Sequence, residues 1–218
     1  MKDPDIHEAV SILREAVKEW RSPAVTIVSQ REGDPFKVLV SCILSLRTQD
    51  RTTAAASARL FALADTPGGM MRLSREEIEK AIYPVGFYRN KAAQILQISR
   101  ELAENYDGRV PDSIEELLRF KGVGRKTANL VVTLGFGKPG ICVDTHVHRI
   151  CNRWGYIRTR TPEETEFALR AKLPQEYWLI INDLLVTFGQ NLCAPLSPRC
   201  STCPLYHLCD RVGVTKSR

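Results

Sequence analysis

The chain has 218 residues, of which 44% are hydrophobic, so it is not a disordered protein and is long enough for one large domain or two small ones. Its formal net charge of +6 suits a polyanion such as nucleic acid, although charge alone does not establish one. No apolar run approaches the roughly 18 residues of a membrane span, and the N-terminal stretch MKDPDIHEAV lacks the apolar core of a secretion signal.

The apolar spacing is helical along almost the whole chain. Hydroxyl caps followed three residues later by glutamate, the pattern of a capping box, occur at Ser74, Ser113 and Thr161. Glycine and proline clusters end the helices, and the loop GFGKPG at 135–140 is the best domain boundary. We predict an all-α fold, with VTIVS at 25–29 as a weak strand candidate. The predicted helices cover residues 4–20, 35–46, 50–64, 75–82, 89–105, 113–120, 125–134, 145–154, 162–172 and 175–188.

A glycine-rich turn joins the helices predicted at 113–120 and 125–134. Gly122 and Gly124 permit unusual backbone angles and leave amides uncovered at a helix start, which favours an anion such as phosphate. Arg125 and Lys126 follow directly, where the helix dipole disfavours positive charge unless an anion is bound. An ordinary tight turn between antiparallel helices is the alternative, and the two cations favour a nucleic-acid backbone.

Lys126 is also a candidate nucleophile. A lysine at a helix start, near other cations and partly desolvated, has a lowered pKa, and a neutral amine forms Schiff bases with sugar aldehydes. The alternative is a lysine that stays protonated and binds phosphate.

Asp144 lies in the stretch ICVDTHVHRI at 141–150, where an apolar run gives way to a helix. The expected role is an N-cap, and a half-buried capping carboxylate could also act as a base or stabilise a cation. His146 and His148 could contact DNA, but their i, i+2 spacing is poor for a shared metal.

Four of the seven cysteines fall in one short segment, CAPLSPRCSTCPLYHLC. Cys193, Cys200, Cys203 and Cys209 can wrap one inorganic centre, and their uneven gaps favour an iron–sulfur cluster over zinc. Buried free thiols are the remaining alternative. His207 could replace a cysteine as a ligand, but a surface or packing role is favoured. The other cysteines, Cys42, Cys142 and Cys151, are expected in the core.

The hairpin GVGRKTA, the stretch VDTHVHR and the C-x6-C-x2-C-x5-C spacing together resemble the endonuclease III family, DNA glycosylases with an associated lyase activity. The stretches DPFKVLVSCILS at 34–45 and GFYRNKAAQI at 86–95 are also similar, and the resemblance covers about residues 5 to 210.

This resemblance implies two helical domains. A six-helix barrel with the helix–hairpin–helix (113–134) would cover 28–138, and a discontinuous cluster domain would join 1–27 to 139–218. The resemblance also implies a [4Fe-4S] cluster on the four cysteines, which mainly shapes a DNA-contacting loop. The partner would be double-stranded DNA with a damaged base or abasic site, bound by a monomer in the cytoplasm at the nucleoid.

By the same resemblance, Lys126 is the nucleophile and Asp144 its carboxylate partner. An oxidised pyrimidine would be flipped out and removed through a Schiff base, and β-elimination would then nick the abasic strand. The related adenine glycosylases lack a lysine at position 126, which favours the bifunctional type. A monofunctional glycosylase and a non-catalytic DNA-binding protein remain alternatives.

The expected DNA contacts extend beyond the two catalytic residues. Lys121 replaces the proline that the family often has in its hairpin. LSLRTQD at 44–50 stands where the family has LSAQ, so Arg47 occupies the position of the gap-filling glutamine and Gln49 follows two residues later. The predicted DNA-binding residues are Gly122, Val123, Gly124, Arg125, Arg47, Gln49, Thr145 and His146.

Overall fold

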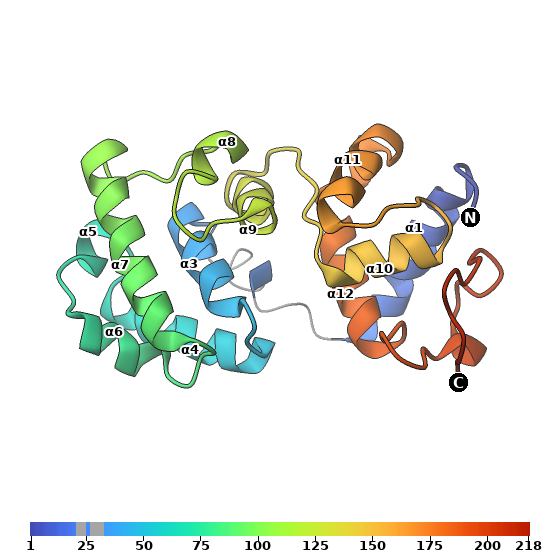
Figure 1. Cartoon of the computed structure of the whole chain (residues 1–218), viewed down its shortest axis with the longest axis horizontal. Coiled ribbons are helices and arrows are strands. Elements are labelled where there is room, and N and C mark those ends of the chain that lie inside the picture. The colour runs from blue at the N-terminus through green and yellow to red at the C-terminus, as the bar shows by residue number, and fades with distance from the viewer. Residues whose placement is uncertain (21–24, 27–32) are drawn as a thin grey trace. The chain divides into compact units, whose positions relative to one another are not determined.

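The computed structural model describes residues 1–20, 25–26 and 33–218. Its packing divides the chain into two units, Met1–Pro23 together with Ile141–Arg218, and Ala24–Gly140. The boundaries expected from the sequence, 27/28 and 138/139, lie within four residues of these positions. All regular elements in the described residues are helical (Figure 1), so the all-α prediction is confirmed. Of the strand candidate at 25–29, residues 25–26 are helical and 27–29 lie outside the described residues.

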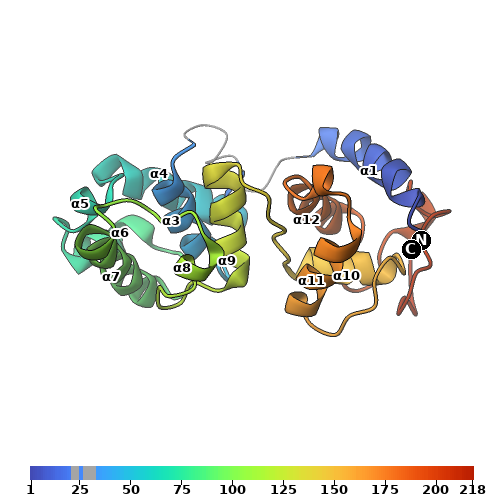
Figure 2. The ribbon, with the colours of Figure 1, turned by 90° about the horizontal axis from the view of Figure 1, so that it is seen from above.

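The unit Ala24–Gly140 is built around one helix, α3 (Pro35–Ser45). Eight of the eleven residues of α3 are buried, because the helix is apolar on all sides and packs against α4, α7, α9 and η2. The view in Figure 2 shows α3 between α4 and α9. The other elements of the unit are α4 (Asp50–Leu63), α5 (Pro67–Met70), α6 (Arg75–Ile82), α7 (Tyr88–Asn105), α8 (Ile114–Leu117), α9 (Arg125–Leu130) and η2 (Val131–Gly135).

The second unit brings the start of the sequence together with its last third. Helix α1 (Asp5–Ala16) packs against α12 (Ile181–Asn191), which in turn packs against α10 (Thr145–Arg153) (Figure 1). Apolar side chains of these helices, among them Leu13, Ile150 and Leu185, are fully buried in one core. The remaining elements are η1 (Val17–Glu19), α11 (Pro162–Lys172), η3 (Gln175–Tyr177) and η4 (Cys200–Thr202).

The three predicted hydroxyl caps are confirmed, but only one forms a full capping box. Ser74 accepts from the Glu77 amide, and the Glu77 carboxylate accepts from the Ser74 amide. Ser113 and Thr161 cap α8 and α11 in the same way. The Thr161 box does not close because its glutamate accepts from the amide of Arg160 instead.

Both helices of the hairpin are shorter than predicted. The α-helix predicted at 113–120 ends at Leu117, because Arg119 and Phe120 donate to carbonyls three residues back and tighten the chain into turns. The helix predicted at 125–134 widens after Leu130 into the π-helical turn η2. There the Thr133 hydroxyl donates to the carbonyl of Asn129, a side-chain bond that competes with regular helix pairing.

Two further helix predictions need correction. The helix predicted at 175–188 is two elements, η3 and α12, because the Ile180 amide donates to the Tyr177 carbonyl and the chain turns tightly between them. The sequence patterns missed the single turn α5, which Thr66 caps by accepting from the amide of Gly69. The two glycines of α5 are weak helix formers, which is why the turn was missed. The only signal for a helix start in the sequence was Thr66 followed by Pro67.

Candidate functional site

The hairpin turn requires glycine at one of its two glycine positions. Gly122 has a φ of +80°, and an added Cβ would lie 2.5 Å from Nε2 of Gln94, which donates to the carbonyl of Lys121. Gly124 has a φ of −98° and open space around it. Val123 between them is buried and donates to the Phe120 carbonyl. The turn is therefore anchored from the inside and leaves the Gly124 side open.

Helix α9 begins without a side-chain cap. Gly124 is its N-cap, and the first turn contains Arg125 and Lys126 with no acidic residue. No capping side chain thus accepts a hydrogen bond from the amides at this end, as expected for a helix start that holds an external anion.

Lys126 is half-buried in the first turn of α9, on a helix that packs against α3. The nearby Cys42 thiol on α3 is fully buried, and burial raises its pKa to about 12 although the charge of Lys126 partly opposes this shift. The Cys42 thiol therefore stays protonated. Lys126 is the more exposed of the two groups, so it is the group available for chemistry at this position.

Asp144 is the N-cap of α10, as the sequence predicted. Its Oδ1 accepts hydrogen bonds from the amides of His146 and Val147, both at 2.9 Å. Within the described residues, Oδ2 accepts no hydrogen bond. One oxygen thus fixes the helix start while the other stays available to a ligand. Lys126 belongs to the unit Ala24–Gly140 and Asp144 to the other unit.

The other polar side chains of α10 lead from Asp144 toward the cysteine segment. Arg149 donates to Nδ1 of His146 at 3.1 Å and to the carbonyl of Cys193 at 2.9 Å, and burial lowers the pKa of its guanidinium. The ring of His146 also lies against Gly189 of α12 and is partly buried. Thr145 is exposed.

Arg47 and Gln49 are both exposed on the short connection between α3 and α4. Arg47 has a φ of +54°, and its guanidinium lies 5.4 Å from the ring centre of Phe87. Phe87 is 59% exposed and also left-handed, with a φ of +58°. The sequence reading missed Phe87, although an exposed aromatic beside Arg89 and Arg47 is typical of nucleic-acid contacts.

The four clustered cysteines line one small cavity together with Trp154 and Phe188. Burial, with a smaller contribution from the charges of the other three cysteines, raises the pKa of the Cys203 thiol to about 11, so all four lie near one another. In the described residues no three His, Cys, Asp or Glu side chains are close enough to hold a metal ion.

The donors around these thiols fit an iron–sulfur cluster. The sulfur of Cys193 accepts from Arg153 at 3.4 Å, and that of Cys209 accepts from the amide of Arg211 at 3.4 Å. An all-thiolate set with N–H donors to its sulfurs is the environment in which such clusters are found.

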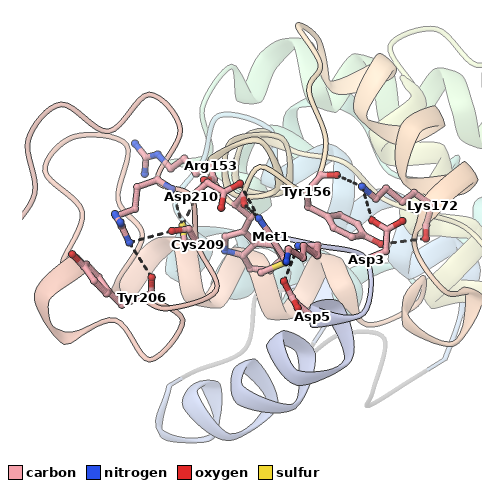
Figure 3. Close-up of polar contacts among 12 residues, drawn as sticks. Met1, Asp3, Asp5, Arg153, Tyr156, Lys172, Tyr206, Cys209 and Asp210 are labelled. Carbon is pink, nitrogen blue, oxygen red and sulfur yellow. Dashed lines mark hydrogen bonds and ion pairs between the residues drawn. The ribbon is translucent and has the colours of Figure 1, made fainter.

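The side chain of Arg153 and the amine of Met1 hold the cysteine segment in place, and Figure 3 shows Met1 beside Asp210. Arg153 donates to the carbonyls of Ala194 and Pro195 as well as to Cys193. The amine of Met1 donates at 2.8 Å to the Trp154 carbonyl and at 2.8 Å to Oδ2 of Asp210, next to Cys209. This segment therefore depends on polar contacts more than on a core of its own.

His207 contacts helix α1 and not the thiols. Its Nε2 is 3.2 Å from a carboxylate oxygen of Glu8, and its side chain is mostly exposed. These contacts agree with the predicted surface role. Separately, no described helix is both long and apolar enough to cross a membrane.

Comparisons with known proteins agree with this arrangement. The family described as "HhH-GPD superfamily base excision DNA repair protein" matches residues 40–175. Endonuclease III of Thermotoga maritima is 50% identical over 182 residues, 84% of this chain and 85% of that protein. Endonuclease III-like protein 1 of Bos taurus is 45% identical over 177 residues, 80% of this chain and 58% of that longer protein.

A solved structure gives the same result in three dimensions. It is described as "Structure of a Trapped Endonuclease III-DNA Covalent Intermediate: Estranged-Adenine Complex" and matches with a TM-score of 0.83 at 33% identity, covering 97% of each chain. The resemblance read from the hairpin, the Asp144 stretch and the cysteine spacing is thereby confirmed. The chain belongs to the endonuclease III family, within the helix–hairpin–helix superfamily of base excision DNA repair proteins.

Proposed function

We propose that this DNA glycosylase removes oxidised pyrimidines through a Schiff base on Lys126 and then nicks the abasic strand by β-elimination. The observation that carries the proposal is the lysine in the first turn of α9, directly after a hairpin with uncapped amides. A related protein, 33% identical, was trapped as a covalent intermediate with DNA, which supports covalent chemistry here.

The first step replaces the base by the enzyme. The neutral Nζ of Lys126 attacks C1′ of the sugar, and the N-glycosidic bond breaks as the base leaves with the bonding electrons and takes up a proton. The proton lost by Nζ passes to the carboxylate of Asp144, whose Oδ1 stays in the helix cap. The sugar ring then opens to a Schiff base between Nζ and C1′.

The second step cuts the strand. The cationic Schiff base acidifies C2′, which loses a proton, and the bond from C3′ to its oxygen breaks so that the 3′ phosphate departs. Water then hydrolyses the Schiff base and restores the amine of Lys126. No oxidant or reductant is needed.

DNA binding is assigned to three groups of residues. The hairpin would hold a backbone phosphate through its amides and Arg125, and the start of α10 would contact the strand near the lesion. Arg47 or Gln49 would fill the gap left by the flipped nucleotide. The proposed contacts are Gly122, Val123, Gly124, Arg125, Thr145, His146, Arg47 and Gln49.

Cys193, Cys200, Cys203 and Cys209 would hold a [4Fe-4S] cluster. Bound there, the cluster would act as a structural centre that keeps the loop between Cys193 and Cys200 in shape for DNA, and base removal would not use it. Iron and sulfide in a brown protein would support this assignment. A colourless protein with stoichiometric zinc would contradict it.

We further propose that the protein acts as a monomer in the cytoplasm, at the nucleoid where its DNA substrate lies. Light scattering of the protein with and without a short damaged duplex tests the first part, since one chain per duplex is expected. Two chains per duplex would contradict it.

The type of product distinguishes the proposal from its alternatives. A labelled duplex with one oxidised pyrimidine should yield free base and a strand ending in an unsaturated sugar. An intact abasic strand that is cut only by hot alkali would indicate a monofunctional glycosylase. Binding without loss of the base, on a panel of oxidised pyrimidines, would indicate a non-catalytic DNA-binding protein.

A further inference from the structure

A lysine with no place in the chemistry above lies inside the unit Ala24–Gly140. Lys91 belongs to the buried face of α7 with Ala92, Ile95 and Leu102, and only 6% of its surface is exposed. Lysines are almost never buried to this extent unless they are paired. Among the described residues Lys91 forms no ion pair, and burial lowers its pKa to about 8.

The ammonium of Lys91 uses all three of its N–H groups on one short segment. It donates to the carbonyl of Leu44 at 3.0 Å, to the carbonyl of Leu46 at 2.5 Å and to the hydroxyl of Thr48 at 3.3 Å. Leu46 is the C-cap of α3, so the cation binds carbonyls at the negative end of that helix. One buried charge therefore fixes the backbone on both sides of Arg47.

The same contacts reach the loop before α7. The Thr48 hydroxyl accepts from the amide of Gly86 at 3.1 Å. A Cβ at Gly86 would lie 2.7 Å from the carbonyl oxygen of Arg47, so only glycine allows this close approach. The connection after α3 and the loop that carries Phe87 are thus held against each other through Thr48 and Lys91.

Arg47 needs such support because of its backbone. Its φ of +54° is unfavourable for a residue with a Cβ, and such conformations persist where the surroundings enforce them. The side chain itself is exposed and contacts the exposed ring of Phe87. Within the part of the chain that the structure describes, the strained backbone gains only one contact, with an exposed ring, so the use of this cation lies outside the free protein.

We infer that Lys91 is a positioning residue whose ammonium holds residues 44–48 so that Arg47 meets the DNA where the flipped nucleotide was. This inference rests on the proposed function, because it takes Arg47 as a contact to damaged duplex DNA. Lys91 itself touches no DNA and no reacting atom. A role in stability alone would leave DNA recognition intact once the variants are folded.

A double-mutant cycle on binding tests the inference without any catalytic step. The probe is a fluorescent duplex with one tetrahydrofuran abasic analogue, which cannot form a Schiff base. Arg47→Ala and Lys91→Met should each weaken binding by about tenfold, the loss expected for one charge-assisted hydrogen bond. The double variant should bind no more weakly than either single variant, because both remove the same contact.

Controls separate positioning from folding. Ser99→Ala changes another buried polar residue of α7, whose hydroxyl donates only to the Ile95 carbonyl, and should bind like the wild type. Binding of Lys91→Met to an undamaged duplex should be unchanged, because no nucleotide is flipped there. If Lys91→Met does not fold, Thr48→Val removes an acceptor of the same ammonium and serves in the same cycle.

Three outcomes would overturn the inference. They are additive losses in the double variant, wild-type binding by Lys91→Met, and equal losses on damaged and undamaged duplex. The proposed chemistry can fail independently of this inference. A protein that binds the analogue but forms no Schiff base on a natural abasic site would refute the lysine mechanism, and the double-mutant cycle on binding would still test the role of Lys91.

Discussion

Three substitutions at Asp144 separate its cap from its proposed chemistry. Oδ1 accepts from two amides at 2.9 Å, so Asp144→Ala removes both bonds and should cost about 1–2 kcal/mol of unfolding free energy. For a chain of 218 residues this corresponds to a fall in Tm of about 3–6 °C. Asp144→Asn and Asp144→Ser keep a capping oxygen, so their Tm should fall by less than about 2 °C.

The turnover rates of the three variants should not follow the order of their Tm values. All three variants lack the carboxylate that we propose takes the proton of Lys126, so single-turnover base release should slow by at least about 100-fold in each. DNA affinity should hold or increase, since a negative charge near phosphates is removed. The assay combines thermal unfolding, single-turnover kinetics and binding to an uncleavable duplex. If Asp144→Asn keeps turnover within about threefold of wild type while Asp144→Ala loses it with Tm, Asp144 is only a cap and the reasoning fails.

Three further predictions concern the hairpin, the cluster and the buried lysine. Gly122→Ala should destabilise the protein by about 1–3 kcal/mol and weaken DNA binding, because Gly122 has a positive φ and the side chain of Gln94 fills the space that a Cβ would need. Gly124→Ala should change the free energy of unfolding by only a few tenths of a kcal/mol, because the space around Gly124 is open. Equal urea midpoints for the two variants would contradict this prediction. Cys203→Ala should lose iron and make the segment after α12 sensitive to protease, while Cys151→Ala in the core keeps its iron; iron retained by the first variant would argue against the cluster. The folded pKa of Lys91 is about 8 and its ordinary value 10.5, so between these values only the unfolded chain keeps the proton, and stability rises with pH. The urea-derived stability of wild type relative to Lys91→Met should therefore increase from pH 8 to pH 10.5 by up to about 3 kcal/mol, and a decrease would refute the assignment.

Features encoded in a few neighbouring residues could be predicted from the sequence. The N-cap of Asp144, the hydroxyl caps and the helical class all depend on contacts within about four residues, where the pattern and its physical cause lie together. The motif did not reveal that the two hairpin glycines differ. Gly122 has a positive φ and crowded surroundings, whereas the space around Gly124 is open. The helix at 125–134 was predicted, but its widening after Leu130 was not, because the apolar pattern is the same for an α-helix and a π-helical turn.

Features that depend on distant residues could not be predicted. Lys91 binds carbonyls 45 and 47 positions earlier in the chain, and its only sequence signal is a lysine on the apolar face of α7. Phe87 becomes noticeable only when Arg47 lies over its ring. Arg47 was predicted from its position in LSLRTQD, the stretch that stands where the family has LSAQ. The structure adds the contacts that hold its backbone.

The central claim is that the amine of Lys126 becomes bonded to DNA. The most direct measurement is borohydride reduction during reaction with a duplex that carries one oxidised pyrimidine, followed by peptide mass mapping of the adduct. We expect one covalent adduct on the peptide that contains Lys126, with none in Lys126→Ala and with full binding retained by that variant on an uncleavable duplex. An adduct on another residue, or no adduct on either a damaged base or an abasic site, would contradict the account.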